Sequence, residues 1–334
     1  MGELHYVNDD EPGIRRKPRG KGFTYTYADG RPVRSPQVLA RIRKLAIPPA
    51  YGDVWICANE LGHLQATGID ARGRKQYRYH PDWEVLRSAN KFERLAEFGR
   101  ALPKIRATIR RDLKNEESTE RRILAVMAEL IDKARLRIGN HAYARENRTY
   151  GATTLLKRHV RLEEDDVIRL RFRGKGGTTE EYELRSRALY DALEEISDLP
   201  GRELFAFPNG DGALRKIDSG AFNAYLAEIA APGMTAKTFR TWGGSVSAFE
   251  VACAALDGGA PIRVAELCAA AAEHLHNTPA VCRTSYIHPA VVSLCEAAPS
   301  SQKAFAAAVG AKGIRGLMRI EARFLAFLEA LQDA

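Results

Sequence analysis

The period of the hydrophobic pattern changes near residue 90, and this change limits the possible folds more than any other feature of the sequence. Before it, side chains alternate at a period of two, as in Phe23–Tyr27, which is typical of strands. After it, apolar residues recur at the spacing of one buried helical face: Ile123, Met127, Leu130, Ile131, Ala134 and Ile138. We therefore expect an α+β protein with a small β-rich domain at residues 1–90 and a larger, mainly α-helical domain at residues 91–334.

Local signals divide the first domain further. The alternation of aromatic and hydroxyl side chains at Phe23–Tyr27, followed by a turn at 28–30, predicts a β-hairpin. Three more segments have strand patterns: residues 53–58, 64–68 and 75–80. The last of these interleaves aromatic and basic side chains, including Tyr77 and Arg78, as a surface that contacts phosphates and bases does. A solvated outer sheet face explains it equally well. Residues 36–45 predict a short helix.

The second domain contains one interruption of its helical pattern. Residues 168–173 alternate apolar side chains with arginine, and a Gly-Lys-Gly-Gly turn leads to a return strand around residues 182–184. This β-hairpin places Lys175 at its tip. The helix before it is expected to end near Gly139, and a final helix is expected from about Ile314.

The net charge is the first clue to a partner. The chain has 51 Lys and Arg against 42 Asp and Glu, and five of the nine net positive charges fall in residues 1–90. A basic chain makes polyanions plausible partners. There is no apolar run long enough for a membrane span and no signal-peptide pattern, so we expect a cytoplasmic protein that does not contact membranes. The five cysteines form no CxxC pair and are expected to be free thiols.

Several common chemistries lack their motifs. The Gly-rich turn at 174–177 joins two strands and lacks the GxxxxGK[ST] pattern of a phosphate-binding loop, so no nucleotide site is expected. No HExxH, EF-hand or spaced His/Cys cluster occurs, and His274 with His276 provides too few ligands for a metal. We expect chemistry without a metal or another cofactor.

Five residues near turns and helix ends together define a reaction, although each has an ordinary structural explanation when taken alone: Arg137, Lys175, Arg240, Asn277 and Tyr286. Two guanidiniums can hold the oxygens of a phosphodiester and stabilise the charge that develops at phosphorus. A tyrosine hydroxyl can attack that phosphorus and store the ester bond as a phosphotyrosine. A lysine on a hairpin can protonate the leaving oxygen, and an amide can donate to the phosphate.

The order of these motifs resembles that of the type IB DNA topoisomerases, particularly the compact bacterial and poxvirus branch. The motifs are Arg137-Ile138-Gly139, Gly174-Lys175, Lys237-Thr238-Phe239-Arg240-Thr241, Asn277-Thr278-Pro279 and Ser285-Tyr286. The resemblance covers nearly the whole chain. It implies that Arg137 and Arg240 bind the scissile phosphate, that Lys175 is the general acid, that Asn277 contacts the phosphate and that Tyr286 is the nucleophile.

The resemblance also implies how such a chain acts on DNA. Tyr143, Lys237 and Arg283 fall at positions that resemble further DNA-contacting sites. The two domains are expected to close as a clamp around double-stranded DNA, with Tyr286 linked to a 3′ phosphate while the free end rotates. This reaction relaxes supercoils without ATP or metal. We expect a monomer associated with the nucleoid.

The sequence departs from the poxvirus and cellular enzymes at one position and leaves two rivals. Those enzymes have His where this chain has Asn277, which can donate a hydrogen bond but cannot become a cation. The adjacent His276 remains an alternative. A tyrosine-type site-specific recombinase would use the same five groups, but typically has His-x-x-Arg where Lys237–Arg240 stands. A basic DNA-binding protein without catalysis is the second alternative.

Overall fold

The computed structural model divides the chain into two compact units, Met1–Asn90 and Lys91–Ala334. It describes residues 4–333 except 21, 72, 84–91, 117, 140, 209–211 and 231–232, and it leaves the side chains of residues 142, 143 and 146 undescribed. The first unit is built on a β-sheet and the second is mainly helical, which confirms the α+β prediction.

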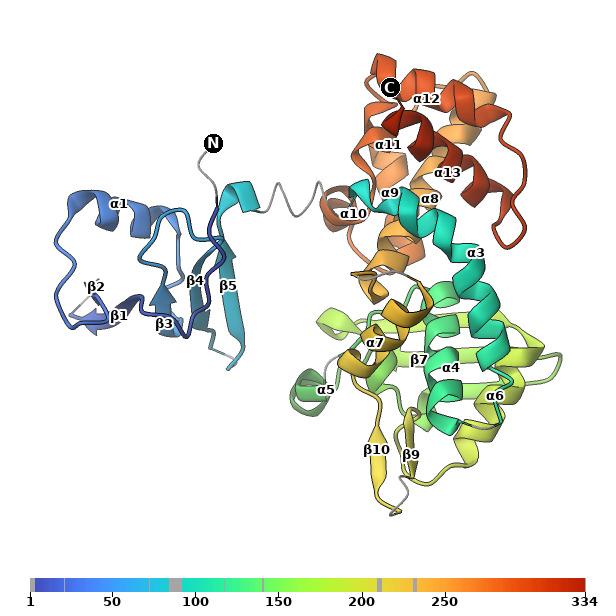
Figure 1. Cartoon of the computed structure of the whole chain (residues 1–334), viewed down its shortest axis with the longest axis horizontal. Coiled ribbons are helices and arrows are strands. Elements are labelled where there is room, and N and C mark those ends of the chain that lie inside the picture. The colour runs from blue at the N-terminus through green and yellow to red at the C-terminus, as the bar shows by residue number, and fades with distance from the viewer. Residues whose placement is uncertain are drawn as a thin grey trace. The chain divides into compact units, whose positions relative to one another are not determined.

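The first unit contains a five-stranded antiparallel sheet in the order β2-β1-β3-β4-β5 (Figure 1). The strands are β1 (Ile14–Arg19), β2 (Gly22–Thr26), β3 (Gly52–Ile56), β4 (Leu64–Ile69) and β5 (Lys75–Tyr79), and the helix α1 is Pro36–Lys44. A small apolar core lies between the sheet and α1: Ile14, Val33, Ile42, Val54, Ile56 and Ala66. Ser35 caps α1, because its side chain accepts from the Val38 backbone N–H.

The hairpin of this unit differs from the prediction in its partner strand. The predicted strand β2 pairs with β1, which precedes it, and Gly20 adopts φ 56° at their connection. The predicted turn at 28–30 exists, since the Gly30 backbone donates to Tyr27, but it leads only to an isolated bridge between Thr26 and Pro32. Pro32 lacks a backbone donor, and this limits the length of a ladder on that side.

The second unit combines a three-stranded sheet with a helical bundle. The sheet has the order β6-β7-β8, from β6 (Val160–Glu163), β7 (Val167–Arg173) and β8 (Thr179–Arg185). Two helices, α4 (Thr119–Ala134) and α6 (Arg187–Asp198), lie against this sheet (Figure 1). The predicted alternation is confirmed: Ile168, Leu170 and Phe172 point into the core, while the arginines between them are exposed.

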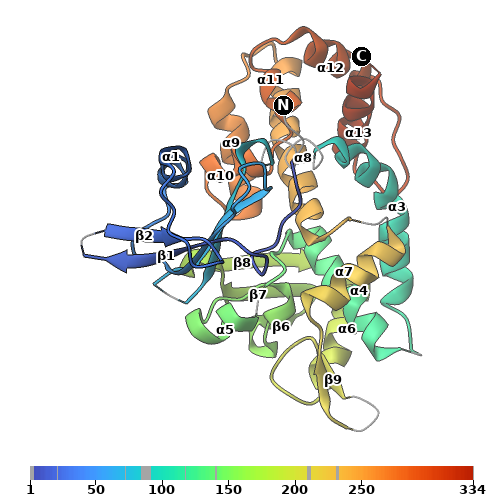
Figure 2. The same ribbon diagram turned by 60° about the vertical axis from the view of Figure 1, so that its left-hand side comes forward.

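The bundle surrounds the long helix α8 (Ala236–Asp257), which packs against α9 (Val264–Leu275), α3 (Leu95–Asp112) and α13 (Arg319–Gln332) (Figure 2). The shorter elements follow these: α5 (His141–Asn147), α7 (Ser219–Ile229), α10 (Pro279–Ser285), α11 (Pro289–Ser293) and α12 (Pro299–Val309), with the small ribbon β9 (Ala206–Pro208) and β10 (Leu214–Lys216). Trp242 and Phe324 are fully buried at the centre of the bundle. The last helix begins at Arg319 rather than near Ile314, because Gly316 adopts φ 97° within a turn that the Leu317 N–H closes on the Ile314 carbonyl, and a left-handed residue cannot continue an α-helix.

No helix among the described residues has both the length and the apolar character that a membrane crossing requires. All five cysteines are free thiols, as predicted.

Candidate active site

Arg137 lies in an extended segment that follows α4. The prediction that this helix continues to Gly139 is wrong, because α4 ends at Ala134 and Arg135 adopts a left-handed conformation with φ 51°. A later loop holds the extended segment: the Ala152 and Thr153 backbone N–H groups donate to the carbonyls of Arg137 and Ile138, both at 2.7 Å. These hydrogen bonds hold residues 137 and 138 outside the helix, so the helix does not continue through Arg137.

The Arg137 guanidinium is held by two acceptors from different elements. Its Nη1 donates to Glu180 Oε1 at 2.6 Å, and its Nη2 donates to the His276 carbonyl at 2.9 Å. These contacts involve two of the five N–H groups of a guanidinium and fix its plane. The side chain remains partly exposed, so it can also bind an anion.

Arg240 is buried in the second turn of α8. Its Nη2 donates to the Leu275 carbonyl at 2.9 Å and its Nη1 donates to the Arg135 carbonyl. Its Nε has no hydrogen-bond partner among the described residues. Burial and the nearby Arg137 lower the pKa of the Arg240 guanidinium. A buried N–H group without a partner beside a second cation is an arrangement that favours an anionic ligand.

The carbonyls that orient these two arginines belong to neighbouring residues, Leu275 and His276, at the end of α9. The two guanidiniums are therefore brought to the same turn of the chain. The structure thus joins two residues that are about a hundred positions apart in the sequence, as the proposed phosphate site requires.

Tyr286 lies directly after α10 and next to Arg240. The centroid of its ring is 5.1 Å from Arg240 Cζ. Ser245 on α8 donates its hydroxyl to the Tyr286 carbonyl at 2.9 Å, and Gly244 permits close contact between α8 and this tyrosine. Tyr286, Arg240 and Arg137 thus form one cluster.

Asn277 and His276 occupy the turn between α9 and α10. Asn277 Oδ1 accepts from the Thr278 backbone at 3.0 Å, which fixes the side-chain amide and leaves its Nδ2 to act as a donor. The His276 ring stacks on Tyr182, with centroids 4.5 Å apart and planes at 6°. The assignment of phosphate contact to Asn277, with His276 as the alternative, stays a prediction.

Lys175 is exposed at the connection between β7 and β8, where the sequence predicts it. Gly176 and Gly177 adopt φ values of 82° and 84°, a conformation that glycine takes at little cost. The neighbouring Gly174 packs against Glu180, the partner of Arg137. The base of the hairpin is therefore connected to the arginine cluster, while the lysine side chain extends from its tip.

The predicted DNA contacts are spread over both units. Tyr77 and Arg78 are exposed on β5 of the first unit, where Tyr77 stacks on Tyr79 with centroids 6.2 Å apart. In the second unit, Lys237 and Arg283 are exposed on α8 and α10. Tyr143 belongs to α5, but its side chain lies outside the described part of the chain.

A buried group of charges that the sequence does not predict supports the cluster. Asp132 accepts from Arg106 at 2.7 Å and from Arg135 at 2.8 Å, and Glu321 accepts from Arg106 and from the Trp242 indole. The arginines hold the pKa values of both buried carboxyls below their ordinary range. Because the Arg135 carbonyl accepts from Arg240, this group also positions a candidate catalytic residue. Its only sequence signal was a set of charged residues at inward-facing helical positions.

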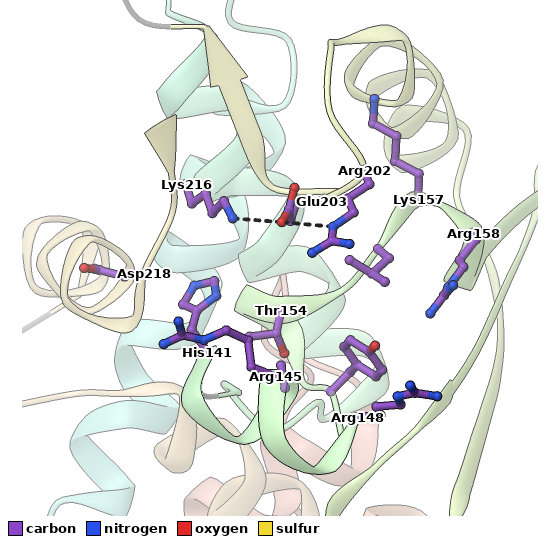
Figure 3. Close-up of a pocket in the computed structure, with 13 residues that line it drawn as sticks. His141, Arg145, Arg148, Thr154, Lys157, Arg158, Arg202, Glu203, Lys216 and Asp218 are labelled. Atoms are coloured by element: carbon purple, nitrogen blue, oxygen red, sulfur yellow. Dashed lines mark hydrogen bonds and ion pairs between the residues drawn. The ribbon is translucent and has the colours of Figure 1, made fainter. Parts of the chain in front are cut away.

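A basic cleft of about 1070 Å³ lies on the same unit, next to the loop that holds Arg137 (Figure 3). Its cationic lining is formed by Arg145, Arg148, Lys157, Arg158, Arg202 and Lys216. Two acidic residues, Glu203 and Asp218, also line it, and Lys216 pairs with Glu203 at 2.8 Å. The excess of cations suits a phosphate backbone. Within the described residues, no group of three or more His, Cys, Asp and Glu side chains is arranged to hold a metal ion.

Comparisons with known proteins identify the family of this chain. Residues 80–308 match the catalytic core of eukaryotic DNA topoisomerase I, and residues 22–70 match the N-terminal domain of bacterial DNA topoisomerase IB. DNA topoisomerase 1B of Acanthamoeba polyphaga mimivirus is 32% identical over 238 residues, which cover 70% of each chain.

Two further relatives match shorter stretches. DNA topoisomerase 1B of vaccinia virus (strain Copenhagen) is 27% identical over 47% of this chain and 49% of its own length. DNA topoisomerase 1 of Daucus carota is 33% identical over 43% of this chain but only 17% of its own length. These matches define an isomerase that acts on DNA. More narrowly, the chain belongs to the type IB DNA topoisomerases.

Proposed function

We propose that this chain relaxes supercoiled DNA by cutting and rejoining one strand through a 3′-phosphotyrosine at Tyr286. One observation carries the proposal: the Tyr286 ring lies against Arg240, whose unpaired Nε and neighbouring Arg137 form an anion site beside the phenol. Family membership supports the same reaction. The arrangement matches the needs of an in-line displacement at a phosphodiester.

The proposed reaction exchanges one P–O bond for another and involves two proton transfers. The Tyr286 oxygen attacks phosphorus after its proton passes to water, the bond from phosphorus to the 5′ oxygen breaks, and Lys175 protonates that leaving oxygen. Arg137, Arg240 and Asn277 stabilise the charge on the non-bridging oxygens. Religation is the reverse, so the ester energy is conserved and the reaction needs neither ATP nor a metal ion.

We further propose that exposed cations outside the catalytic cluster hold the DNA backbone. In the first unit these include Arg78 beside Tyr77, and in the second they include Lys237, Arg283 and the basic cleft of Figure 3. Such contacts neutralise phosphates and release counterions, so binding should weaken steeply as salt rises. We propose that the protein acts as a monomer and closes around the duplex, in the cytoplasm and on the nucleoid.

The direct test is relaxation of a supercoiled plasmid in EDTA without nucleotide. Tyr286→Phe should lose relaxation and the covalent DNA adduct but retain DNA binding, because only the hydroxyl is removed. Tyr190→Phe, on α6, is a matched control that should relax DNA normally. Relaxation by the Tyr286→Phe protein would show that another residue is the nucleophile, and strand-exchanged products from two DNA sites would indicate a recombinase instead.

A further inference from the structure

Glu180 is a buried carboxylate that contacts the candidate catalytic residue Arg137 and the neighbouring Tyr182 at once. It is 2% exposed, and its Oε1 accepts from Arg137 Nη1 at 2.6 Å. Its Oε2 accepts from the Tyr182 hydroxyl, also at 2.6 Å. Glu180 and Tyr182 both lie on β8, and their side chains point to the same face of the sheet because they are two positions apart on one strand. Both carboxylate oxygens are therefore engaged, which a carboxylate at this depth requires.

The same carboxylate connects to the hairpin that carries Lys175. A methyl group added to Gly174 would lie 2.0 Å from Glu180 Oε1, so the backbone just before Lys175 packs directly on this side chain. The hairpin backbone closes with a bond from Gly174 N–H to the Thr178 carbonyl at 2.8 Å. A shift of Glu180 would therefore move the base of the Lys175 turn as well as Arg137.

Tyr182 extends the connection to the turn that contains Asn277. Its ring is stacked on His276, and the His276 carbonyl is the second acceptor of Arg137. Burial and the Glu180 carboxylate raise the pKa of the Tyr182 phenol, which keeps the hydroxyl as a donor to Glu180. The Glu180–Tyr182 pair thus contacts the surroundings of three of the five candidate catalytic residues.

The charge of Glu180 also suits the site. Arg137 and Arg240 are neighbouring cations, and one buried carboxylate beside them reduces their net charge to +1, equal and opposite to that of a phosphodiester. A neutral residue would leave two adjacent cations that repel each other in the free protein.

We propose that Glu180, with Tyr182, is a positioning residue for strand cleavage: it fixes Arg137 and sets the Lys175 hairpin and the Asn277 turn relative to it. This inference rests on the proposed function. Glu180 does not touch the DNA; it acts through groups that do. The sequence signal for it was a carboxylate at an inward-facing position of an amphipathic strand, two residues before a tyrosine.

The test uses the full-length protein and single-turnover cleavage of a DNA oligonucleotide at saturating enzyme. Glu180→Gln keeps the shape but removes the charge, and we expect the cleavage rate to fall about tenfold or more while the dissociation constant for DNA is unchanged. Tyr182→Phe keeps the ring stacking and should give a smaller loss. The matched control is Glu181→Gln, the exposed neighbour on the same strand that pairs with Arg171, which should stay within about twofold.

A substrate with sulfur in place of the 5′ leaving oxygen separates the two parts of the proposal, because a thiolate leaves without a proton. The defect of Glu180→Gln should become smaller on this substrate, since the part due to Lys175 disappears, but some defect should remain through Arg137. An undiminished defect would refute the link to the hairpin.

Equal rates for Glu180→Gln and Glu181→Gln would refute the whole inference, and faster cleavage by Glu180→Gln would show that Glu180 competes with DNA for Arg137. If a variant has a lower melting temperature, its cleavage rate is measured below that temperature. Failure of the proposed function appears differently, because the unmodified protein would then form no Tyr286 adduct.

Discussion

Gly244 offers a sharp test of how closely α8 must approach the tyrosine. A methyl group added at this position would lie 2.8 Å from Leu275 Cδ1, 3.1 Å from Tyr286 Cβ and 3.2 Å from the Tyr286 carbonyl oxygen. The leucine methyl can rotate away, but the tyrosine backbone is fixed by its hydrogen bond from Ser245. In Gly244→Ala, the Tyr286 segment must therefore move by a few tenths of an ångström.

The effects of this change on stability and on activity should differ strongly. Alanine is more favourable than glycine in a helix interior by about 1 kcal/mol, whereas overpacking costs about 1–3 kcal/mol. The two effects partly cancel, so the free energy of unfolding should fall by less than about 2 kcal/mol. Cleavage depends on placing the phenol in line with phosphorus, and an error of about 1 Å can cost about a hundredfold in rate. We expect a slow but folded enzyme.

The assay is single-turnover covalent adduct formation, measured beside a thermal melt. Gly258→Ala is the control, because Gly258 directly follows the last residue of α8 and an added methyl there would lie 3.3 Å from its nearest neighbour, the Ala254 carbonyl oxygen. Cleavage by Gly244→Ala at the unmodified rate would refute the argument that this contact positions Tyr286.

Three further predictions concern the arginines and their support. Arg240→Lys keeps the charge, but its single nitrogen cannot contact two carbonyls and a phosphate at once. The cleavage rate should therefore fall about 10²–10³-fold with DNA binding largely retained. A near-normal rate in the same adduct assay would contradict the role of Arg240. Asp132→Asn removes one buried carboxylate from its pairs with Arg106 and Arg135 and should lower the free energy of unfolding by about 3–5 kcal/mol in denaturant titration. The exposed Asp191→Asn should change it by less than about 1 kcal/mol. Because the folded-state pKa values of Asp132 and Glu321 lie below their unfolded values of 3.8 and 4.5, their stabilisation is present above about pH 4.5 and is lost as the pH falls through the folded values. The melting temperature should thus drop steeply below about pH 4 in the unmodified protein and less steeply in Asp132→Asn.

The sequence predicted those parts of the fold that depend on local periodicity. The strand pattern of residues 168–173 and the glycines after it placed Lys175 at a hairpin tip, and the structure has it there. The apolar series from Ile123 predicted α4 but not its end, because a distant loop binds the carbonyls of Arg137 and Ile138. No local pattern contains that information.

The candidate site was predictable as a set of residue types but not as a network. The motif order singled out Arg137, Arg240 and Tyr286, yet Lys237 and Arg240, three residues apart, proved to be exposed and buried respectively. Glu180 was missed because a charged residue in a strand is usually solvated, and only the fold shows that this one faces an arginine. Whether such a charged side chain is buried or exposed depends on contacts between segments that are distant in the sequence.

The C-terminal end of α9 supplies carbonyls that bind both arginines of the candidate site. The last carbonyls of a helix have no partner within it and carry the negative end of its dipole. In this protein the Leu275 carbonyl, and the His276 carbonyl just after it, bind Arg240 and Arg137. The helix terminus therefore acts as a counter-ion for both candidate catalytic cations, so the same residues that end α9 also assemble the proposed anion site. Fraying of this one turn and loss of catalytic competence would be a single event, which links local unfolding of the bundle directly to the chemistry on DNA.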